Sequence, residues 1–410
     1  MNKMKKVPEI RFKEFAEDWE NTDASIIFKT YFDKNHPDLP VLSASQEYGM
    51  IIREDVGFKV QHNKESEAGY KRVLPGQFVI HLRSFQGGFA HSDVEGITSP
   101  AYTIIEFRDK SQQDDIFWKY VLTSKEFIKR LETVTYGIRD GRSISFEDFS
   151  ELGFNVPDIK EQCKIGKTLT VIDTLIRKLE QKLEKLRNIK QSLLNQMFVN
   201  VNRGGGYAPL IRFNGYNNKW IMLTLNDISE RITRKNTNNE SSLPLTVSAQ
   251  YGLINQNDFF NSRIASKDVS GYYLIKNGEF AYNKSSSDGY PFGAVKRLDR
   301  YKMGVLSTLY IIFALNKDKI DSDFLSIFFE TDKWYEHISQ RAAEGARNHG
   351  LLNISSEDFL DLKILTPKSK NEQNLIAGYV SALDRLVEGT SSKLTKLRTM
   401  KQSLLQKMFV

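Results

Sequence analysis

The sequence predicts an α+β fold in which two globular α/β domains form a pseudo-two-fold internal repeat. Two long antiparallel helices are expected to join them as a coiled-coil spacer. Three observations support this fold. The segment 185–199 returns as 396–410, an offset of 211 residues. Short β-branched and aromatic runs separated by Gly, Pro and Asn indicate strands and turns in both halves. Each half then ends in a heptad pattern, which is typical of helices that pack on other helices.

Each copy opens with the same motif, Pro-x-Ile-Arg-Phe followed by Trp, over Pro8–Trp19 and Pro209–Trp220. The spacing from Pro to Trp is the same in both copies. Because Arg11 and Arg212 repeat identically, we expect them to pack or pair within the structure rather than to distinguish two ligands.

The globular parts continue in register. Both contain a helical stretch, expected near 114–133 and 321–341, and both close with a short strand that runs into Pro157 or Pro367. The other matched segments are expected to be strands and loops, namely 41–49 with 245–252, 69–78 with 271–280, 100–107 with 308–313, and the Gly-Arg loops 136–142 with 344–350.

From Glu161 and Glu372 onward, the apolar residues alternate in steps of three and four. Roughly 38 residues at a rise of 1.5 Å each give about 57 Å of helix, which cannot bury its seam alone. We expect the two copies to pack on each other; the alternative is that each helix folds back on its own globular domain. Lys190 and Lys401 occupy seam positions, where a long stem can reach solvent and set the register. The expected coil or partner contacts are Leu179, Leu183, Leu186, Leu193, Met197, Leu394, Leu397, Leu404 and Met408.

These features divide the chain into five parts. The expected parts are the globular domains 1–158 and 209–368, the central helix 159–199, the C-terminal helix 369–410 and the linker 200–208. The linker contains three consecutive glycines, which favour a flexible joint over a phosphate-binding loop.

The composition is that of a soluble globular protein, with 40% hydrophobic residues and a net charge of +7. This mild basic excess permits a polyanionic partner without requiring one. Cys163 is the only cysteine, which excludes an internal disulfide and suits a reducing compartment. No apolar segment follows the basic N-terminus, so we expect a cytoplasmic protein.

No catalytic constellation is found in the sequence. The triplet Gly166-Lys167-Thr168 has Glu161 where a phosphate-binding loop needs glycine, and it falls within an expected helix. Amino-methyltransferase motifs, spaced nuclease carboxylates and a His-Glu-x-x-His zinc motif are not found either. The sequence therefore favours a protein that binds, spaces or scaffolds over an enzyme, and it predicts no metal site.

Four repeated features are similar to those of one known family. They are the Pro-x-Ile-Arg-Phe…Trp opening, the Gly-x-Arg loop, the Pro…Glu-Gln transition into the helix, and the helix end Lys-Gln-Ser-Leu-Leu-x-x-Met-Phe. Together they resemble the specificity (S) subunits of type I restriction–modification enzymes, over essentially the whole chain. The resemblance implies a non-catalytic DNA-binding subunit with two target-recognition domains. Each would read one half of a bipartite, asymmetric DNA site, and the helices would set the spacer.

The resemblance also implies partners. Two methyltransferase (M) subunits would dock on this chain, and restriction (R) subunits would join in the full complex on double-stranded DNA. S-adenosylmethionine, ATP and Mg²⁺ would belong to those partners, and this chain would bind no cofactor itself.

Reading bases requires side chains with donors or acceptors on loops that reach a groove of DNA. Polar residues beside Gly suit this task, because the backbone can approach closely there; the alternative for any one of them is a solvated loop residue. Gln46 with Tyr48, and Gln250 with Tyr251, are further candidates unless their rings belong to the core. The main candidates are His81, Arg83, Ser84, Gln86, Arg139 and Arg142 in the first domain, and Asn283, Lys284, Ser285, Ser286, Ser287, Tyr290, Arg347, Asn348 and His349 in the second.

Two other functions fit the same features. One is a stand-alone tandem-domain DNA-binding repressor or architectural protein, which would bind its site without a partner. The other is a structural coiled-coil adaptor, which would have no salt-dependent affinity for DNA.

Overall fold

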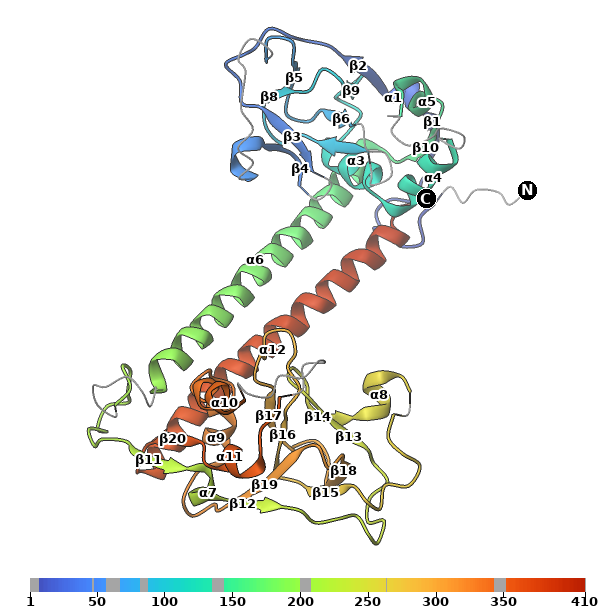
Figure 1. Cartoon of the computed structure of the whole chain (residues 1–410). Helices are drawn as coiled ribbons and strands as arrows, with labels where there is room; N and C mark the ends of the chain where they lie inside the picture. Colours follow the sequence, from blue (N-terminus) through green and yellow to red (C-terminus); the bar gives the residue numbers. More distant parts are fainter. Residues whose placement is uncertain are drawn as a thin grey trace. The chain divides into compact units, whose positions relative to one another are not determined.

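The chain folds into two compact units (Figure 1). Unit 1 comprises residues 1–181 with 391–410, and unit 2 comprises residues 182–390. Each unit therefore contains one globular domain and a part of both long helices, whereas the sequence-based division places each helix in a segment of its own. The computed structural model describes residues 7–45, 48–56, 67–81, 88–134, 144–199, 208–262, 264–342 and 352–409.

Unit 1 is built on a four-stranded antiparallel sheet in the order β2-β9-β6-β7, with three two-stranded antiparallel ribbons, β1-β10, β3-β4 and β5-β8. Its strands are β1 (Glu20–Asp23), β2 (Phe28–Tyr31), β3 (Leu42–Ser45), β4 (Gly49–Ile52), β5 (Lys71–Val73), β6 (Phe78–Ile80), β7 (Phe89–His91), β8 (Gly96–Thr98), β9 (Thr103–Phe107) and β10 (Gly153–Val156). Its short helices are α1 (Ala24–Ile27), η1 (Arg53–Val56), α3 (Asp115–Leu122), α4 (Lys125–Val134) and α5 (Phe146–Ser150).

Unit 2 repeats this topology strand for strand, with a sheet in the order β12-β19-β16-β17 and the ribbons β11-β20, β13-β14 and β15-β18. Its strands are β11 (Ile221–Thr224), β12 (Ser229–Ile232), β13 (Leu245–Ser248), β14 (Gly252–Asn255), β15 (Tyr273–Lys276), β16 (Phe280–Asn283), β17 (Ala294–Arg297), β18 (Met303–Leu306), β19 (Ile311–Leu315) and β20 (Lys363–Thr366). Its short helices are α7 (Leu225–Ile228), α8 (Gln256–Phe260), α9 (Ser322–Phe328), α10 (Tyr335–Ala342) and α11 (Ser356–Leu360). The long helices are α6 (Ile159–Met197) and α12 (Lys370–Lys407).

The stretch expected to be helical near 114–133 is two helices rather than one. The Asp114 side chain caps α3 by accepting a hydrogen bond from the Phe117 amide at 2.7 Å. The Ser124 hydroxyl then accepts from the Phe127 amide at 3.1 Å, where α4 begins. Such acceptors satisfy amides at a helix start that have no intrahelical partner. The matching stretch of unit 2 is likewise divided, into α9 and α10.

Aromatic side chains fill the main core of each globular domain. In unit 1, the rings of Phe28 and Trp118 meet edge to face with centroids 5.1 Å apart, and both side chains are fully buried. In unit 2, the rings of Tyr282 and Phe359 stack at 4.3 Å. Large rings bury much apolar surface per residue, so these contacts stabilise the sheet against the helices.

An ion pair ties the opening motif of unit 1 to the start of α6. Arg11 donates through Nε and Nη2 to the two carboxylate oxygens of Glu161, at 2.8 Å each. The indole Nε1 of Trp19 donates to the same carboxylate at 3.2 Å. Glu161 is fully buried, and its hydrogen bond with Arg11 raises the pKa of the guanidinium.

Unit 2 has the same ion pair. Arg212 donates to Glu372 at 2.6 and 2.9 Å, and Trp220 donates to that carboxylate at 3.3 Å. The expectation that the repeated arginines make structural contacts is therefore confirmed.

The glutamine that follows each of these glutamates joins the helix to the globular domain. Gln162 accepts from the Asp114 amide at 3.0 Å and donates to the Pro157 carbonyl at 2.9 Å. Gln373 makes the matching contacts in unit 2, at 2.7 and 2.8 Å. The repeated Pro…Glu-Gln motif is thus explained by the contacts that fix where each long helix begins.

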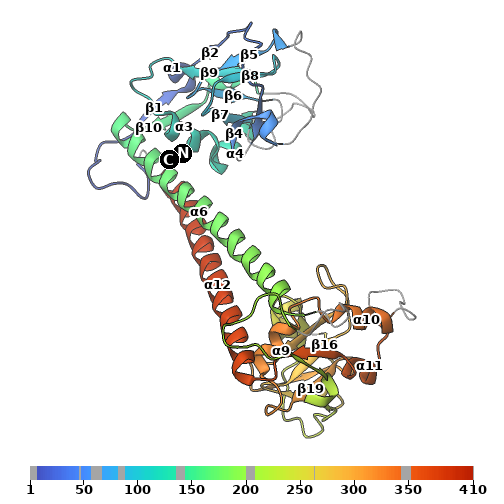
Figure 2. The same ribbon diagram turned by 90° about the vertical axis from the view of Figure 1, so that its left-hand side faces the viewer.

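The repeated helix ends pack into the globular cores. In unit 1, Met408 is 3% exposed within the core, and the Phe409 ring lies 5.6 Å from that of Phe117. The C-terminus accordingly lies beside the helices of unit 1 in both views (Figures 1 and 2). In unit 2, Met197 and Phe198 at the end of α6 occupy the core in the same way.

Within unit 1, the first part of α6 runs antiparallel to the last part of α12 (Figures 1 and 2). Asp173 pairs with Lys401, and Glu180 pairs with Arg398, each at 2.5 Å. The residue number rises along one helix while it falls along the other, as antiparallel pairing requires. The antiparallel arrangement predicted from the repeat is therefore confirmed within this unit.

Candidate nucleic-acid interface

A groove of about 380 Å³ opens on unit 2. Its lining comes from the β13–β14 hairpin with its turn, from α8, and from the β16–β17 connection. The lining residues are Thr246, Val247, Ser248, Ala249, Gln250, Tyr251, Phe259, Phe260, Asn283, Ser285, Ser286, Ser287, Asp288, Tyr290 and Ala294.

Asn283, at the end of β16, holds the loop that lines the groove. Its Oδ1 accepts from the Ser285 amide at 3.0 Å, and its Nδ2 donates to a carbonyl of β13 at 3.4 Å. Ser287 and Tyr290 exchange backbone hydrogen bonds of 3.2 and 2.8 Å, which closes the loop into a tight turn. Gly293 follows with φ of +78°, and a Cβ there would lie 2.1 Å from the Asn283 carbonyl oxygen, so only glycine fits.

The structure brings most of the unit 2 candidates together, with two qualifications. The side-chain amide of Asn283 is engaged within the loop, as just described. Lys284 does not line the groove: its Nζ donates to the Ile354 carbonyl at 3.4 Å, and burial lowers the pKa of its ammonium group. The candidates that line the groove are Asn283, Ser285, Ser286, Ser287, Tyr290, Gln250 and Tyr251.

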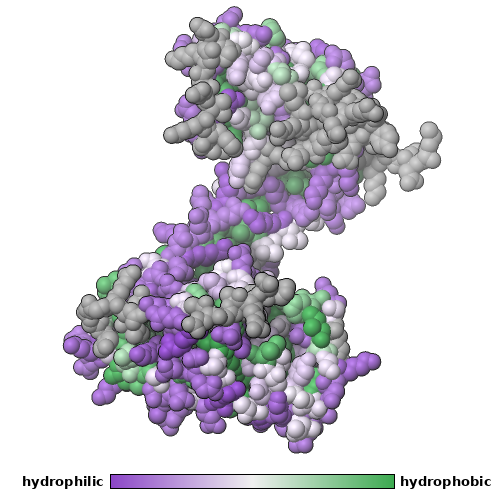
Figure 3. All heavy atoms as spheres, in the orientation of Figure 1, coloured by the Kyte–Doolittle hydropathy of each residue, from purple (hydrophilic) through white to green (hydrophobic). Residues whose placement is uncertain are grey.

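Exposed aromatic rings supply the apolar part of this groove. Tyr251 is 58% exposed, Phe259 44% and Phe260 45%. The two phenylalanine rings meet edge to face, with centroids 4.8 Å apart. Hydrophobic residues reach the surface on the side where Figure 1 places α8 (Figure 3). The sequence-based search missed this pair; the available signal is two adjacent phenylalanines inside the polar run Gln-Asn-Asp-Phe-Phe-Asn-Ser.

The matching loop of unit 1 begins at His81, directly after β6. The His81 amide donates to the Gly88 carbonyl at 2.8 Å, which closes the base of the loop. Burial lowers the pKa of the His81 imidazole, and its Nε2 has no hydrogen-bond partner among the described residues. The His81 ring lies beside that of Tyr102, with centroids 6.2 Å apart, and its role in DNA contact stays a prediction. The candidates Arg83, Ser84, Gln86, Arg139, Arg142, Arg347, Asn348, His349 and Gln46 lie outside the described residues.

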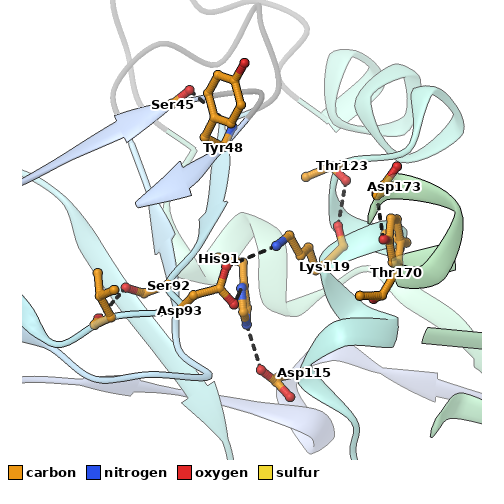
Figure 4. Close-up of polar contacts among 12 residues, drawn as sticks. Ser45, Tyr48, His91, Ser92, Asp93, Asp115, Lys119, Thr123, Thr170 and Asp173 are labelled. Atoms are coloured by element: carbon orange, nitrogen blue, oxygen red, sulfur yellow. Dashed lines mark hydrogen bonds and ion pairs between the residues drawn. The ribbon is translucent and has the colours of Figure 1, made fainter. Parts of the chain in front are cut away.

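Unit 1 has a groove of about 650 Å³ that is more polar than the groove of unit 2. It lies between the globular domain of unit 1 and that unit's parts of the two long helices. Lys119 pairs with Asp93 at 3.3 Å (Figure 4). Tyr48, a candidate from the sequence, also lines this groove and is 60% exposed. The charged residues of its lining are Lys119, Lys125, Arg177, Arg398 and Lys401, against Asp93, Asp173 and Glu180.

His91 links β7 to the start of α3 in the same region (Figure 4). Its side chain is 1% exposed, and its Nε2 lies 2.7 Å from Oδ2 of Asp115. This hydrogen bond lowers the pKa of the Asp115 carboxyl group. A Cβ on Gly49 would lie 2.3 Å from the His91 carbonyl oxygen, so the β3–β4 turn reaches this strand only through glycine.

Both seam lysines form ion pairs with the facing long helix. Lys401 pairs with Asp173 in unit 1, and Lys190 pairs with Asp384 in unit 2, each at 2.5 Å. Of the predicted seam residues, Leu183 and Leu394 are buried. Those that are partly buried are Leu179, Leu186, Leu193, Leu397 and Leu404, while Met197 and Met408 lie in the globular cores.

No group of three or more His, Cys, Asp or Glu side chains within the described part of the chain is arranged to hold a metal ion. None of the helices there combines the length and the apolar character that crossing a membrane requires.

Comparison with known proteins gives a family match and similar folds. Residues 5–188 match the family model described as the type I restriction modification DNA specificity domain. The chain is similar to the S subunit of a type I restriction–modification system from M. genitalium, at 15% identity over 98% of this chain and 99% of that chain, with a TM-score of 0.58. It is also similar to the HsdS subunit from Thermoanaerobacter tengcongensis, at 14% identity over 95% and 96%, with a TM-score of 0.47. The match to the first of these structures covers 98% of this chain, so the fold that the two proteins share includes both units.

Proposed function

We propose that this chain, whose residues 5–188 belong to the type I restriction modification DNA specificity domain family, is the DNA-specificity subunit of a type I restriction–modification complex. Each globular domain reads one half of a bipartite, asymmetric site in double-stranded DNA. The paired long helices set the spacing between the halves. The subunit supplies recognition and no catalytic group of its own.

One observation carries this proposal. The two units share the same strand order and stabilising contacts, together called the frame, but they differ in the side chains of their loops. Strand order, the arginine–glutamate ion pairs and the packed helix ends repeat in both units. The connections after the matching strands β6 and β16 do not repeat: residues 81–88 read His-Leu-Arg-Ser-Phe-Gln-Gly-Gly, whereas residues 284–293 read Lys-Ser-Ser-Ser-Asp-Gly-Tyr-Pro-Phe-Gly. A molecule that reads two different half-sites needs this combination, because the frame must hold both readers alike while the reading side chains differ.

The proposal includes the partners that the family resemblance implies. Two methyltransferase subunits dock on the repeated parts of this chain, since two similar surfaces suit two copies of one partner. Restriction subunits join that complex. S-adenosylmethionine, ATP and Mg²⁺ are held by those partners.

The direct test is to sequence methylated adenines in host DNA with and without this chain. We expect one bipartite motif to be methylated only when the chain is present. Replacing Ser286 and Ser287 by alanine should then change one half of the motif and leave the other intact. An unchanged methylation pattern after deletion of the chain would refute the proposal.

The remaining functions are separated by binding measurements. A stand-alone repressor or architectural protein would bind its site tightly as a free monomer, whereas the S subunit is expected to copurify with two methyltransferase chains. This alternative rests on the same two-domain repeat. A structural adaptor would show no steep loss of DNA affinity with salt, which phosphate contacts impose.

The role of the helices as a spacer has its own test. Matched insertions of about one heptad, roughly seven residues, in α6 and α12 preserve the seam pattern while lengthening both helices. We expect the same two half-sites with a longer gap between them. An unchanged gap would exclude the helices as the element that sets the spacing.

A further inference from the structure

We propose that Phe259, Phe260 and Tyr251 form the apolar wall of a subsite in unit 2 that contacts the C5-methyl group of a thymine. This inference rests on the proposed function, because it requires duplex DNA in the groove. It adds the chemical feature of the half-site that unit 2 recognises and the residues that recognise it.

The first support is the exposure of the phenylalanine pair. Phe259 and Phe260 are nearly half exposed, although they are adjacent and their rings touch. Contiguous apolar side chains left in water are unfavourable, and on soluble proteins such patches mark interaction sites.

Local hydrogen bonds hold these rings at the groove. The Asn255 side chain caps α8 by accepting from the Asn257 amide at 3.1 Å, and it also donates to Asp258 at 3.0 Å. Asn261 ends the helix with φ of +52°, a left-handed conformation that asparagine tolerates better than most residues. Asn255 and Asn261 therefore define the two ends of α8, while its two phenylalanines line the groove.

The second support is the comparison with unit 1. Gly49 and Gly252 hold matching positions, because each pairs with the last residue of the preceding strand in its hairpin. Counting seven and eight residues on from each glycine gives Val56-Gly57 in unit 1 and Phe259-Phe260 in unit 2. The aromatic pair is thus not a requirement of the shared fold, and its difference between the copies suits a role in telling two half-sites apart.

The third support is the chemistry of the lining. Among the described residues, no Lys or Arg lines the groove, and its lining includes Asp288, whose carboxylate would repel phosphate. This lining is suited to base edges rather than to the DNA backbone. Three serines, Ser285, Ser286 and Ser287, line the same groove as the aromatic wall. An A·T pair presents hydrogen-bonding atoms beside a methyl group in the major groove, which is the combination that this lining complements.

The test removes one methyl group from the DNA. The half-site read by unit 2 is first identified from the methylation motif, and each of its thymines is replaced in turn by uracil. The full chain, in the complex with which it copurifies, should bind about fourfold more weakly when one particular thymine is replaced, because a buried methyl contact is lost. The double variant F259A/F260A should bind the thymine and uracil duplexes equally.

Two controls accompany the test. Leu309→Ala removes another exposed apolar side chain of unit 2, 61% exposed and outside the groove, and it should keep the wild-type preference for thymine. Uracil in the other half-site should not distinguish wild type from F259A/F260A.

Different negative results would refute the methyl contact and the proposed function. If the wild-type complex binds every uracil duplex of this half-site as well as the thymine duplex, or if the preference survives in F259A/F260A, the methyl contact is refuted while specific binding stands. A half-site without thymine refutes it as well. If no site-specific binding is found at all, the proposed function fails, and this inference fails with it.

Discussion

Unit 1 and unit 2 share one backbone frame and differ in the side chains that this frame carries. Both have the same strand order, the same arginine–glutamate ion pair and the same packed Met-Phe helix end. They differ in the residues seven and eight after the hairpin glycine, Val56-Gly57 against Phe259-Phe260, and in the connections that follow β6 and β16. The repeated residues are therefore those that the fold requires, and the residues that differ are the first place to seek separate ligands.

Charge near the long helices shows this difference clearly. In unit 1, Lys119 and Arg177 line the polar groove. Counting from the cap residues Asp114 and Asp321, Lys119 matches Ser326; counting from Glu161 and Glu372, Arg177 matches Glu388. Arg398 and Lys401 of the same groove do repeat, as Arg187 and Lys190, so the charges of Lys119 and Arg177 are what distinguish unit 1 here.

Core packing also differs at one matched position. Val121 lies seven residues after the cap of α3, and Phe328 lies seven residues after the cap of α9. Phe328 is 2% exposed, with its ring 6.3 Å from that of Phe198. In unit 1, Val121 instead lines a cavity of about 530 Å³ beside Phe409. Val121 is thus one wall of this cavity, whereas the larger Phe328 packs against Phe198.

The largest expected effect comes from breaking the shared ion pair. Glu161→Ala removes a fully buried carboxylate and leaves Arg11 and Trp19 without it, which should destabilise unit 1 by about 3 to 5 kcal/mol. Glu372→Ala should do the same to unit 2. Calorimetric unfolding, with the exposed Glu388→Ala as control, measures both. Equal stability of E161A and E388A would contradict the assigned role.

The next effect concerns the unequal cores. Phe328→Val should destabilise unit 2 by about 2 to 3 kcal/mol, because it creates a cavity among buried rings. Val121→Phe should change the stability of unit 1 by less than about 1 kcal/mol, because the cavity already present accepts the ring. Thermal unfolding compares the two variants. A loss in V121F as large as that in F328V would show that the hollow does not accommodate a phenylalanine.

A smaller effect depends on pH and belongs to unit 1. The hydrogen bond from His91 lowers the pKa of Asp115 in the folded state. The resulting stabilisation is present above the unfolded-state pKa, about 3.9, and is lost as pH falls through the folded-state value. We expect about 1 kcal/mol at most, because the Asp115 side chain is 36% exposed and solvent screens the pair.

Asp115→Asn is the variant that tests this dependence. Stability of unit 1 should fall less between pH 5 and pH 2 in D115N than in wild type, as followed by chemical denaturation at each pH. At the matched positions of unit 2, Arg297 donates to the Ser322 hydroxyl at 2.8 Å and also pairs with Asp299 and Asp323, so the comparison is made between wild type and D115N within unit 1. A parallel decline in wild type and D115N would contradict the assignment.

The smallest effect is at the helix seam. Lys401→Met and Lys190→Met each remove one partly exposed ion pair, so each should cost less than about 1 kcal/mol in dilute buffer. At about 1 M salt the Debye length falls to roughly 3 Å, and the difference from wild type should shrink further. Denaturant titrations at both salt concentrations check this. A large loss that persists in high salt would mean that the lysine stems, rather than their charges, stabilise the seam.

Much of the fold was accessible from the amino-acid order alone. The repeat, the strand-rich domains, the heptad helices and the structural use of Arg11 and Arg212 all follow from spacing and identity, because the same side chains in the same order meet the same local constraints. The division of the 114–133 stretch was missed, since apolar spacing does not record where a serine hydroxyl caps a new helix. Met408 is predicted to be a coil or partner contact, whereas it packs into the core of the N-terminal globular domain.

The candidate interface divides in the same way. Polar loops beside glycine pointed to the β16–β17 connection before any fold was known, and the residues from Ser285 to Tyr290 do line one groove. Only the tertiary structure placed α8 against that loop and showed that Lys284 lies elsewhere. Which side chains share a groove depends on contacts between strands far apart in sequence, and no local pattern encodes those distances. The amino-acid order specifies two similar globular domains, whereas the contacts formed on folding specify which residues of each domain lie together in a groove.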